Sequence, residues 1–476
     1  MALLKIVSGE KPREIAVQVL GRRGREQFTE GLLDQVLAGA DLPPVDRRLS
    51  QELVYGIVRW QATLDWLIDR KTRGRTQKPA LRDLLHLGLY QIFWLARIPN
   101  HAAVHVTVEL AKHRGFGPQA GFVNALLRGY LREFDATRVL LDELKTTRPH
   151  LGFSHPEWLV DRWQKRWGQP RTAELLAWNN VPPKTFARIN TLKMDAARLL
   201  PIWREENVEY DFVRHDWFEE NLVFELKAHP PLNRLPSFQR GFFYIQDPST
   251  LLAVHALDPR PGQTVLDLCA APGGKLTYIA QLMGNQGRIV ARDLDPHRIK
   301  LIEDNCARLG VTCVEVSPGS AGVSPATAAR PSDRSNEGTE KALEENPDAP
   351  LGTPEERRER RAPVLPDHKF DRILVDAPCS NTGVMRRRVD LRWRLSPQEI
   401  ERLRTMQLEL LRAAAPQLQP GGTLVYSTCS LEPEENRQLI STFLNTDPGF
   451  KLETERELLP FSDVADGAYA AKLRRA

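Results

Sequence analysis

The stretch TVLDLCAAPGGKLTYIA, residues 264–280, decides the fold expected for the C-terminal half of the chain. A short apolar run with β-branched residues ends at Asp267. The turn that follows contains Gly273 and Gly274, which let a ligand approach the backbone, and a helix is expected to begin near Lys275. Neither G-x-G-x-x-G nor the phosphate-loop pattern G-x-x-x-x-G-K-S/T is present here. The turn therefore predicts a pocket for a nucleoside without phosphates.

Short apolar runs like this one recur toward the C-terminus, and helical stretches separate most of them. They are GRIVARDL (287–294), VTCVEV (311–316), FDRILVDA (370–377) and GGTLVYSTC (421–429). Strands that alternate with helices predict a doubly wound, mainly parallel sheet of the Rossmann-like type, here over residues 246–476. Because ligands bind such a sheet at the carboxyl ends of its strands, the residues that follow each run are the site candidates.

Acids and thiols follow three of these runs. Asp293 comes about 20 residues after the glycine turn, where a carboxylate can accept both hydroxyls of a ribose; its alternative role is a helix cap. Asp376 and Cys379 follow one later run and Cys429 follows another. A single buried cysteine is more often a packing residue, but these two lie in turns rich in Pro, Ser, Thr and Asn. The pair therefore predicts thiol chemistry at the edge of the sheet.

The cysteine content, the hydropathy and the N-terminus limit the class of protein. The five cysteines are Cys269, Cys306, Cys313, Cys379 and Cys429; they include no C-x-x-C pair, so we expect free thiols and no metal. No apolar run approaches the roughly 20 residues that span a bilayer, and the N-terminus lacks the apolar stretch of a secretory signal. We expect a cytoplasmic protein without a membrane partner.

The N-terminal part is predicted to be an all-helical domain over residues 1–150. Apolar residues recur three or four positions apart within residues 10–148, as at Leu53, Val54 and Ile57. Residues 1–150 contain 23 Lys and Arg against 16 Asp and Glu, a net charge of +7, whereas the rest of the chain carries a net charge of −2. The asymmetry suits a phosphate-bearing partner, and equally a solvated helical surface.

Two further regions are expected around the sheet. Residues 151–245 predict a helical linker and a small α+β module, in which Arg188, Asn190 and Lys193 are either RNA contacts or ordinary surface residues. Residues 317–366 contain eight prolines and no aromatic residue, with dense mixed charge. Such a segment buries too little apolar area to offset chain entropy, so we expect a disordered insertion, with an RNA-binding arm as the alternative.

Three motifs of the C-terminal region resemble those of the RNA cytosine-C5 methyltransferase family. They are DLCAAPGGK (267–275), DAPCSNTGV (376–384) and YSTCSLEPEEN (426–436), and the resemblance runs from about Thr185 to Arg475. In the helical part, RRLSQELVYGIVR (47–59) and FVNALLRGYLR (122–132) resemble the NusB family of RNA-binding domains. The combination is similar to the branch of the family that methylates small-subunit ribosomal RNA.

The resemblance implies a cofactor, a partner and a target. The cofactor is S-adenosyl-L-methionine, and the positions matching its binding motifs are Cys269, Ala270, Ala271, Pro272, Gly273, Gly274, Lys275, Asp293 and Asp376. The implied partner is 16S rRNA, unassembled or partly assembled, with cytosine 967 as the target base. We expect a monomeric enzyme.

The implied reaction explains why two cysteines are needed. Carbon 5 of cytosine is a poor nucleophile until a thiolate adds to carbon 6; it can then attack a sulfonium methyl group. Loss of the carbon 5 proton and expulsion of the thiolate call for a base and a second polar group. The resemblance implies that Cys429 attacks and Cys379 assists release, an order that the sequence alone does not settle. Asp376 can hydrogen-bond the cytosine edge at N3 and N4, or else cap the strand end.

Two features remain open. Members of the family have an aspartate near the adenine after the third strand, but here the strand runs into the insertion at Ser317; Glu315 and Asp367 are the nearest acids, and neither is assigned. A group of arginines follows the DAPCS turn, and we expect it to hold RNA phosphates rather than to form a solvated loop; its members are Arg386, Arg387, Arg388, Arg392 and Arg394.

Three alternatives compete with this prediction. One is a transfer RNA cytosine-C5 methyltransferase, with the same chemistry on another RNA. A second is a non-catalytic RNA-binding assembly factor with a degenerate pocket, which the missing acid favours and the cysteine pair disfavours. A third is a nicotinamide oxidoreductase, which the absent G-x-G-x-x-G disfavours.

Overall fold

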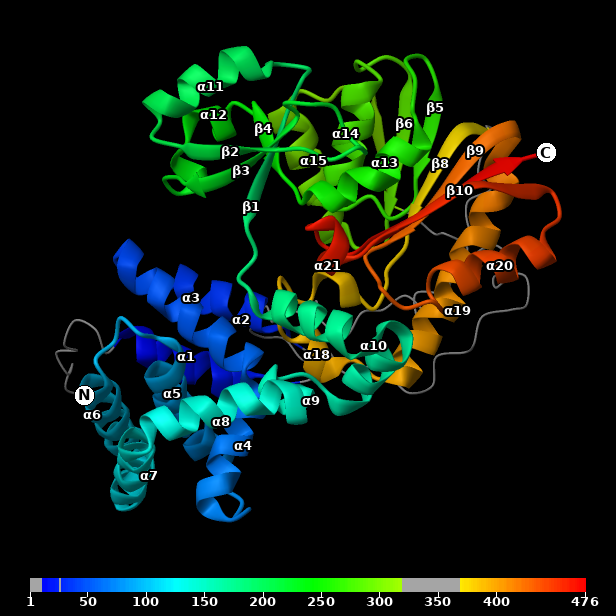
Figure 1. Cartoon of the computed structure of the whole chain (residues 1–476). Helices are drawn as coiled ribbons and strands as arrows, with labels where there is room; N and C mark the ends of the chain where they lie inside the picture. The colour runs from blue at the N-terminus through cyan, green and yellow to red at the C-terminus, as the bar shows by residue number, and fades with distance from the viewer. Residues whose placement is uncertain (1–10, 25–26, 319–368) are drawn as a thin grey trace, which may run out of the picture. The chain divides into compact units, whose positions relative to one another are not determined.

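The computed structural model describes residues 11–24, 27–318 and 369–476 and shows two compact units (Figure 1). The first unit contains the described residues up to Pro182 together with Met385–Arg394; the second contains the other described residues from Pro183 onward. The expected insertion at 317–366 lies outside the described residues except for Ser317 and Pro318, so its disorder stays a prediction.

The first unit is helical, as the apolar spacing predicted. Its main helices are α1 (Lys11–Arg22), α2 (Thr29–Ala38), α3 (Pro44–Arg59), α4 (Gln61–Thr72), α5 (Pro79–Trp94), α6 (Asn100–Ala111), α7 (Ala120–Arg132), α8 (Phe134–Thr147), α9 (Pro149–Gly152) and α10 (Glu157–Asn180). Short turns η1 (Lys112–Phe116) and η2 (Gly117–Gln119) join α6 to α7. Leu53, Val54 and Ile57 are buried on α3, which packs against α1 and α5. No helix in the described ranges combines the length and the apolarity of a membrane span.

A segment from much later in the chain completes the helical core. Met385–Arg394, which ends in the short helix α18 (Leu391–Arg394), belongs to this unit. Val389 is part of the unit's apolar core, Trp393 packs against that core, and its indole nitrogen donates to the carbonyl of Val58 at 2.8 Å.

The second unit begins with a small antiparallel sheet of order β2-β3-β1-β4. Its strands are β1 (Thr185–Ile189), β2 (Glu209–Val213), β3 (Val223–Ala228) and β4 (Phe243–Ile245), accompanied by α11 (Ala196–Glu205), η3 (Leu232–Arg234) and α12 (Pro236–Gln239). Trp203 of α11 is buried against the rings of Phe224 and Phe243, which meet it edge-on. Asp195 caps α11 by accepting the backbone amide of Arg198. This is the predicted α+β module.

The large sheet has the order β10-β11-β9-β8-β5-β6-β7. Its strands are β5 (Thr264–Asp267), β6 (Arg288–Asp293), β7 (Val314–Pro318), β8 (Phe370–Asp376), β9 (Leu418–Thr428), β10 (Phe450–Leu458) and β11 (Ala468–Arg475). The strands from β9 to β7 are parallel, as predicted, whereas β11 is antiparallel to both of its neighbours. We did not anticipate β10 and β11 from the sequence.

Helices cover both faces of this sheet (Figure 1). One face carries α13 (Leu251–Leu257), α14 (Gly274–Leu282) and α15 (Pro296–Leu309), and the other carries α19 (Pro397–Ala414) and α20 (Arg437–Thr446). Short elements η4 (Pro248–Thr250), η5 (Thr382–Val384), η6 (Ala415–Gln417) and α21 (Pro460–Asp463) complete the unit. The strand order reverses between β5 and β8, and ligands of doubly wound folds bind at such a point.

Candidate active site

The two cysteines predicted at the sheet edge meet one another. Cys379 follows β8 and Cys429 follows the neighbouring parallel strand β9, so both turns leave the same edge. Their Sγ atoms lie 3.4 Å apart. Cys379 is buried and Cys429 is partly exposed. The hydrogen bond with Cys429, together with burial, raises the pKa of Cys379 well above its usual value.

Asn381 connects the two cysteine turns. Its Nδ2 donates to the backbone carbonyl of Cys379 at 2.6 Å, and its Oδ1 accepts a hydrogen bond from Cys429 Sγ at 3.0 Å. Because a carbonyl only accepts, the amide must present nitrogen to Cys379 and oxygen to Cys429. Asn381 has φ = +56°, a left-handed conformation that Asn tolerates better than most residues.

A lysine from the glycine turn reaches the same place. Lys275 Nζ donates to Asp376 Oδ2 at 2.7 Å, and Ser427 Oγ donates to Asp376 Oδ1 at 2.7 Å. Burial alone would lower the pKa of Lys275, but Asp376, Cys429 and also Asp267 raise it above its usual value. Lys275, whose side chain is 17% exposed, is therefore a largely covered cation that interacts electrostatically with both Asp376 and Cys429, an environment that the sequence did not reveal.

Asp267, at the end of β5, is a polar group that we missed from the sequence as a site residue. It is 1% exposed, and neither of its carboxylate oxygens has a hydrogen-bond partner. Burial, and secondly the charge of Asp376, raise its pKa to about 7, while the charge of Lys275 acts in the opposite direction. The sequence feature that could have identified Asp267 as a site residue is its position between a strand and a glycine turn.

The backbone of the glycine turn is held in place by surrounding side chains. Gly273 has φ = +102°, which explains the glycine, and α14 begins at Gly274, close to the predicted start. Asp293 Oδ2 accepts the amide of Ala271 at 3.2 Å, while Arg298 donates to the Ala271 carbonyl at 2.7 Å. Cys269 has a raised pKa because it is buried beside acids, so it contributes as a neutral thiol.

Asp293 lies beside this turn and does not cap a helix. The cap of α15 is Asp295, whose side chain accepts the amide of His297. Asp293 is buried and also accepts from Arg298 Nη1 at 3.2 Å. A buried carboxylate thus lies at the end of the second strand beside the glycine turn, where the sequence placed the candidate for ribose binding.

These residues fit the expected cofactor. S-adenosyl-L-methionine carries a sulfonium and an ammonium group, and an unpartnered, buried carboxylate such as Asp267 is costly until a cation approaches it. The adjacent acids Asp293 and Asp376 add negative charge, since each raises the pKa of Asp267.

No acid for the adenine emerges from the described residues. Glu315 is exposed and forms an ion pair with Arg288 at 2.7 Å. Arg288 begins β6, whereas the glycine turn lies at the carboxyl end of the sheet, so Glu315 is directed away from the site. Asp367 lies outside the described residues.

The arginines after the DAPCS turn are mostly structural, which corrects our prediction. Arg392 is 0% exposed and donates to the carbonyl of Asn179, the side chain of Asn180 and the carbonyl of Ser154, at 3.0, 2.9 and 3.1 Å. Cationic side chains are favourable at helix C-termini, and α10 ends at Asn180. Arg392 is thus unavailable to RNA.

The neighbouring arginines divide between burial and exposure. Arg386 is buried with its guanidinium over the Trp178 ring, 4.1 Å from the centroid, so the prediction is wrong for it as well. Arg394 lies over Phe28 at 4.4 Å and is largely covered. Arg387 is partly exposed, and Arg388 is the exposed member of the group.

Two of the three polar candidates in the small module are likewise buried contacts, whereas Lys193 is exposed. Arg188 is 1% exposed and donates to Gln246, to the Gly274 carbonyl and to Thr277. Asn190 donates to the carbonyls of Gly241 and Leu309, at 2.8 Å each. The RNA-contact prediction is wrong for Arg188 and Asn190, because both join β1 to the large α/β domain. Lys193 donates to the carbonyls of Arg240 and Arg308.

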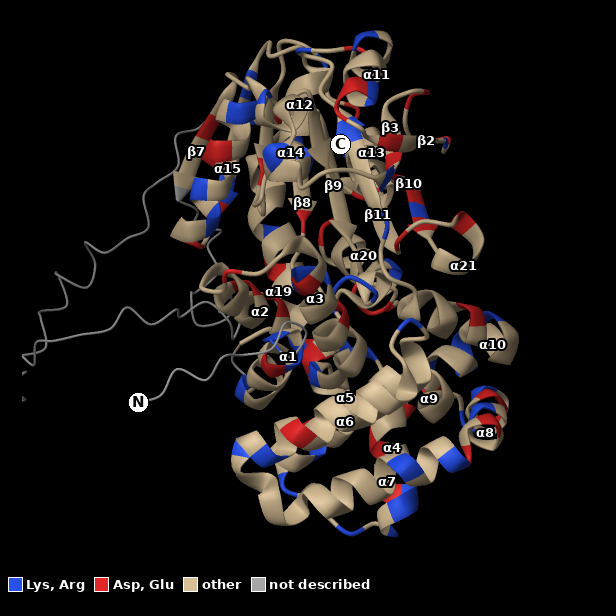
Figure 2. Cartoon of the chain, turned by 90° about the vertical axis from the view of Figure 1, so that its left-hand side faces the viewer, with Lys and Arg blue, Asp and Glu red and all other residues tan. Residues whose placement is uncertain are grey.

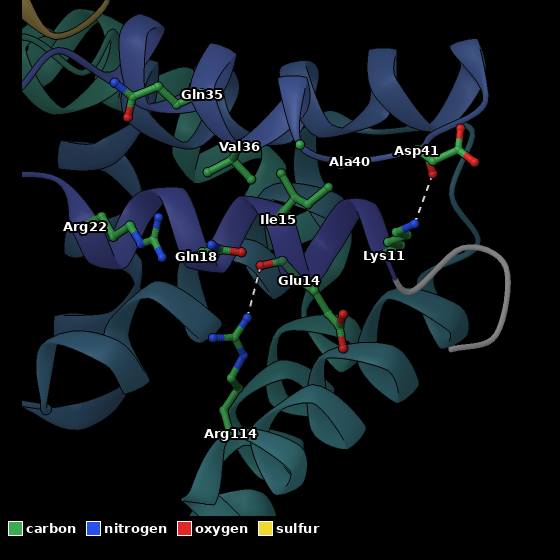
Figure 3. Close-up of a pocket in the computed structure, with 11 residues that line it drawn as sticks. Lys11, Glu14, Ile15, Gln18, Arg22, Gln35, Val36, Ala40, Asp41 and Arg114 are labelled. Carbon is green, nitrogen blue, oxygen red and sulfur yellow. Dashed lines mark hydrogen bonds between the residues drawn. The ribbon is translucent and has the colours of Figure 1, made fainter. Parts of the chain in front are cut away.

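A hollow in the helical unit is separate from this chemistry. Figure 3 shows Lys11 donating to the carbonyl of Asp41 at 2.9 Å and Arg114 donating to the carbonyl of Glu14 at 3.2 Å across it. Its lining contains neither a cysteine nor a strand-end acid of the sheet.

Within the described ranges, no group of three or more His, Cys, Asp or Glu side chains is arranged so that it could bind a metal ion.

A doubly wound sheet with a glycine turn, strand-end acids and a thiol pair at one edge defines the class as a methyltransferase. Family models extend this to RNA: residues 254–334 and 355–474 match the 16S rRNA methyltransferase RsmB/F model, and residues 10–132 match the NusB family. Residues 155–227 match the ferredoxin-like domain of RsmF/B-like methyltransferases.

Full-length relatives define the family. A probable ribosomal RNA small subunit methyltransferase B of Bacillus subtilis (strain 168) is 36% identical over 451 residues, which cover 94% of this chain and 90% of that protein. Its counterpart in Synechocystis is 34% identical, covering 95% and 96%. A crystal structure of a methyltransferase homolog from Pyrococcus horikoshii is 28% identical, covers 71% of this chain and 99% of that chain, and has a TM-score of 0.53. The chain belongs to the ribosomal RNA small subunit methyltransferase B family, which confirms both resemblances.

Proposed function

We propose that the protein methylates carbon 5 of a cytosine in 16S rRNA, at cytosine 967 by resemblance, with S-adenosyl-L-methionine as methyl donor. The observation that carries the proposal is the thiol pair, 3.4 Å apart, beside the Lys275–Asp376 ion pair. A two-thiol site with an adjacent acid is what addition to carbon 6 and later release of the base require.

The cofactor would be held by the glycine turn, with Asp293 toward the ribose and Asp267 toward the cationic end. When bound, it supplies an electrophilic methyl group on a sulfonium. The turn presents backbone at Gly273, where an added Cβ would meet no atom closer than 3.7 Å, whereas Gly274 is packed against Gln246 and Tyr244.

Cys429 is the nucleophile in this proposal. Cys379 keeps its proton because its pKa is raised by the hydrogen bond with Cys429 and by burial, whereas Cys429 is the more exposed of the two thiols and the one that can reach a substrate. The ammonium of Lys275 favours the thiolate of Cys429 electrostatically. The Cys429 sulfur adds to carbon 6, and the electron pair displaced from the C5–C6 double bond makes carbon 5 nucleophilic.

Asp376 and Cys379 act on the same ring. The Asp376 side chain is 30% exposed, so its carboxylate can accept the cytosine amino group and stabilise the adduct. After transfer, the carbon 5 proton leaves to a base, the C5–C6 double bond re-forms, and the C6–S bond breaks with its electron pair returning to Cys429. Cys379, a protonated thiol in contact with the Cys429 sulfur, assists this release.

RNA would be recognised outside the sheet, because a base must leave its stack to reach a thiol. Figure 2 shows Lys and Arg interspersed with acidic residues along α8, whereas the charged residues of α7 are Arg128 and Arg132. On α8, for example, exposed Arg138 has the acid Asp142 four residues later. Such a mixed distribution of charge suits recognition of RNA shape better than binding to the phosphate backbone by electrostatic attraction alone.

The test uses the two cysteines separately. Cys429→Ala should abolish methyl transfer to 16S rRNA, whereas Cys379→Ala should accumulate a denaturant-resistant protein–RNA adduct, because attack proceeds and release fails. Cys313→Ala, a thiol outside the site, is the matched control and should keep both properties. The opposite pattern in the two site variants would mean that their roles are exchanged.

Mapping of the product identifies the substrate. 5-Methylcytosine should be absent at one position of 16S rRNA from cells that lack the protein, and purified 16S rRNA should accept the methyl group in preference to transfer RNA. Preferential transfer to transfer RNA would support the first alternative. Tight binding of 16S rRNA with no transfer at all would indicate an assembly factor.

A further inference from the structure

A buried glutamate connects the two cysteine turns. Glu435 lies in the loop between Cys429 and α20 and is 0% exposed. Its Oε1 accepts the backbone amide of Ser380 and the side chain of Gln407, each at 2.9 Å. Its Oε2 accepts the hydroxyls of Ser380 and Ser430. All four donors are neutral.

The donors come from the residues next to the thiols. Ser380 directly follows Cys379 in the chain, and Ser430 directly follows Cys429. The two hydroxyls also lie 3.0 Å from one another. One carboxylate thus joins the two turns immediately behind their sulfur atoms, while Gln407 of α19 anchors it to the domain and also donates to the Pro378 carbonyl.

Burial of this carboxylate is costly. It raises the pKa of Glu435, and the hydrogen bonds from Ser380, Ser430 and Gln407 act in the opposite direction. A buried charge without a cationic partner is retained only where several hydrogen bonds compensate its desolvation, and an apolar side chain would fill the same space at lower cost. An apolar side chain would not fix two separate turns to a single point.

We propose that Glu435 is a positioning residue that sets the separation of Cys379 and Cys429 by binding the serine after each of them. This inference rests on the proposed function, in which both sulfur atoms act on one pyrimidine ring. A displacement of about 1 Å at reacting groups can cost on the order of 100-fold in rate, so the bridge matters even though Glu435 contacts no substrate.

Two substitutions separate hydrogen bonding from charge. In Glu435→Gln, the amide oxygen can still accept from Ser380 and Gln407, and the amide nitrogen can donate to serine hydroxyls that rotate to accept. Glu435→Leu removes every one of these bonds. Glu434→Gln makes the same change at the carboxylate one position earlier, while Ser380 and Ser430 keep their bonds to Glu435, and is the matched control.

The separation of the thiols is measured directly with diamide. This oxidant takes two electrons and two protons from a thiol pair and leaves a disulfide, which peptide mass mapping assigns to Cys379 and Cys429. Glu435→Leu should slow formation of this disulfide at least ~10-fold and lower kcat ~100-fold, while Glu435→Gln stays within ~10-fold of wild type in both. Cofactor affinity should be unchanged, because residues 269–275 do not bind Glu435.

The outcomes are decisive. A wild-type disulfide rate in a folded Glu435→Leu protein overturns the proposal, and so does equal damage by Gln and Leu, which would assign the role to charge. If Glu435→Leu does not fold, the S380A/S430A double variant replaces it: it keeps the carboxylate, removes both hydroxyl donors, and must also slow the disulfide. If wild-type protein methylates no cytosine, the proposed function fails while the disulfide rates still decide the position of the thiols.

Discussion

The turn Asp376–Val384 and the segment Met385–Arg394 follow one another in the chain, yet they belong to different compact units. In the turn, the Asp376 side chain remains 30% exposed and forms an ion pair with Lys275, which suits the substrate contact that we propose for it. In the segment, Arg392 is fully buried on backbone carbonyls and Asp390 binds the amide and hydroxyl of Thr29. Both regions contain charged residues. Asp376 in the turn lies in the candidate active site, whereas Arg392 and Asp390 in the segment form buried contacts within the helical unit.

The difference shows that proximity in sequence to the cysteine turn does not determine what a charged residue does. Its solvent exposure and its hydrogen-bond partners do. Arg392 and Asp390 hold the segment in the helical unit, where an unpaired charge would be costly. The residues of the turn are held by Gly383 as well, whose amide donates to the Cys429 carbonyl at 2.9 Å and whose α-carbon leaves no room for a side chain beside Gly467. Four experiments test the comparison.

The largest effect is expected from Arg392→Met. The substitution leaves the acceptors at Asn179, Asn180 and Ser154 buried without their donor, and each buried unsatisfied group costs about 1–3 kcal/mol. We expect a total loss of about 3–5 kcal/mol, measured as a lower midpoint of urea unfolding of the full chain. Arg388→Met, at an exposed position, should change stability by less than about 0.5 kcal/mol. Weaker RNA binding at unchanged stability would instead restore the phosphate role for Arg392.

Asp376→Asn should have the next largest effect, on rate rather than stability. It removes the negative charge that faces Lys275 and the cytosine edge, and loss of one such electrostatic contact costs about 100- to 1,000-fold in kcat. Single-turnover methyl transfer at saturating RNA measures the loss. Ser427→Ala removes one hydrogen bond to the same carboxylate and serves as the milder control. Full activity in Asp376→Asn would give the turn the same purely structural role as the segment.

The pH dependence of cofactor binding should show a smaller effect through Asp267. Its pKa in the folded protein is about 7, above the ordinary value of 3.8, so its contribution to stability is present below the ordinary value and is lost as pH rises through about 7. A bound cation lowers that pKa, so cofactor affinity should rise as pH increases toward about 7, by at most ~10-fold per pH unit, and level off above it, with release of a proton on binding below about 7. Calorimetry in two buffers of different ionisation enthalpy measures the proton. Asp267→Asn should abolish the release; a persisting release would assign it to another group.

Much of the fold was predictable because buried parallel strands have a strong local signal. The runs that became β5, β6, β8 and β9 are apolar on both faces, as strands covered by two helical layers must be. The strands we missed have a weak signal: in β10 the residues between Phe450 and Leu458 are mostly charged and solvent-facing, as at a sheet edge, and β11 is rich in alanine.

The site residues could be predicted from the sequence only where their location follows from their position at the end of a strand. Cys379 and Cys429 follow neighbouring parallel strands, so their meeting needed no knowledge of packing. The environments of Lys275, Asp267 and Glu435 depend on which groups approach them from other strands and helices. The burial of Arg188 depends in the same way on contacts between β1 and α14, far apart in sequence.

Arg388 provides the smallest and most selective test, because it is the exposed arginine of a segment whose neighbours are largely covered. If it binds one phosphate, Arg388→Ala should weaken 16S rRNA binding only a few-fold and lower the slope of log K against log salt by about 0.7–0.9, equally for all sequences. Binding titrations over a range of salt concentrations measure this slope. An unchanged slope would remove the phosphate role from Arg388, the most exposed arginine of Met385–Arg394, and would strengthen the contrast between this largely structural segment and the turn before it.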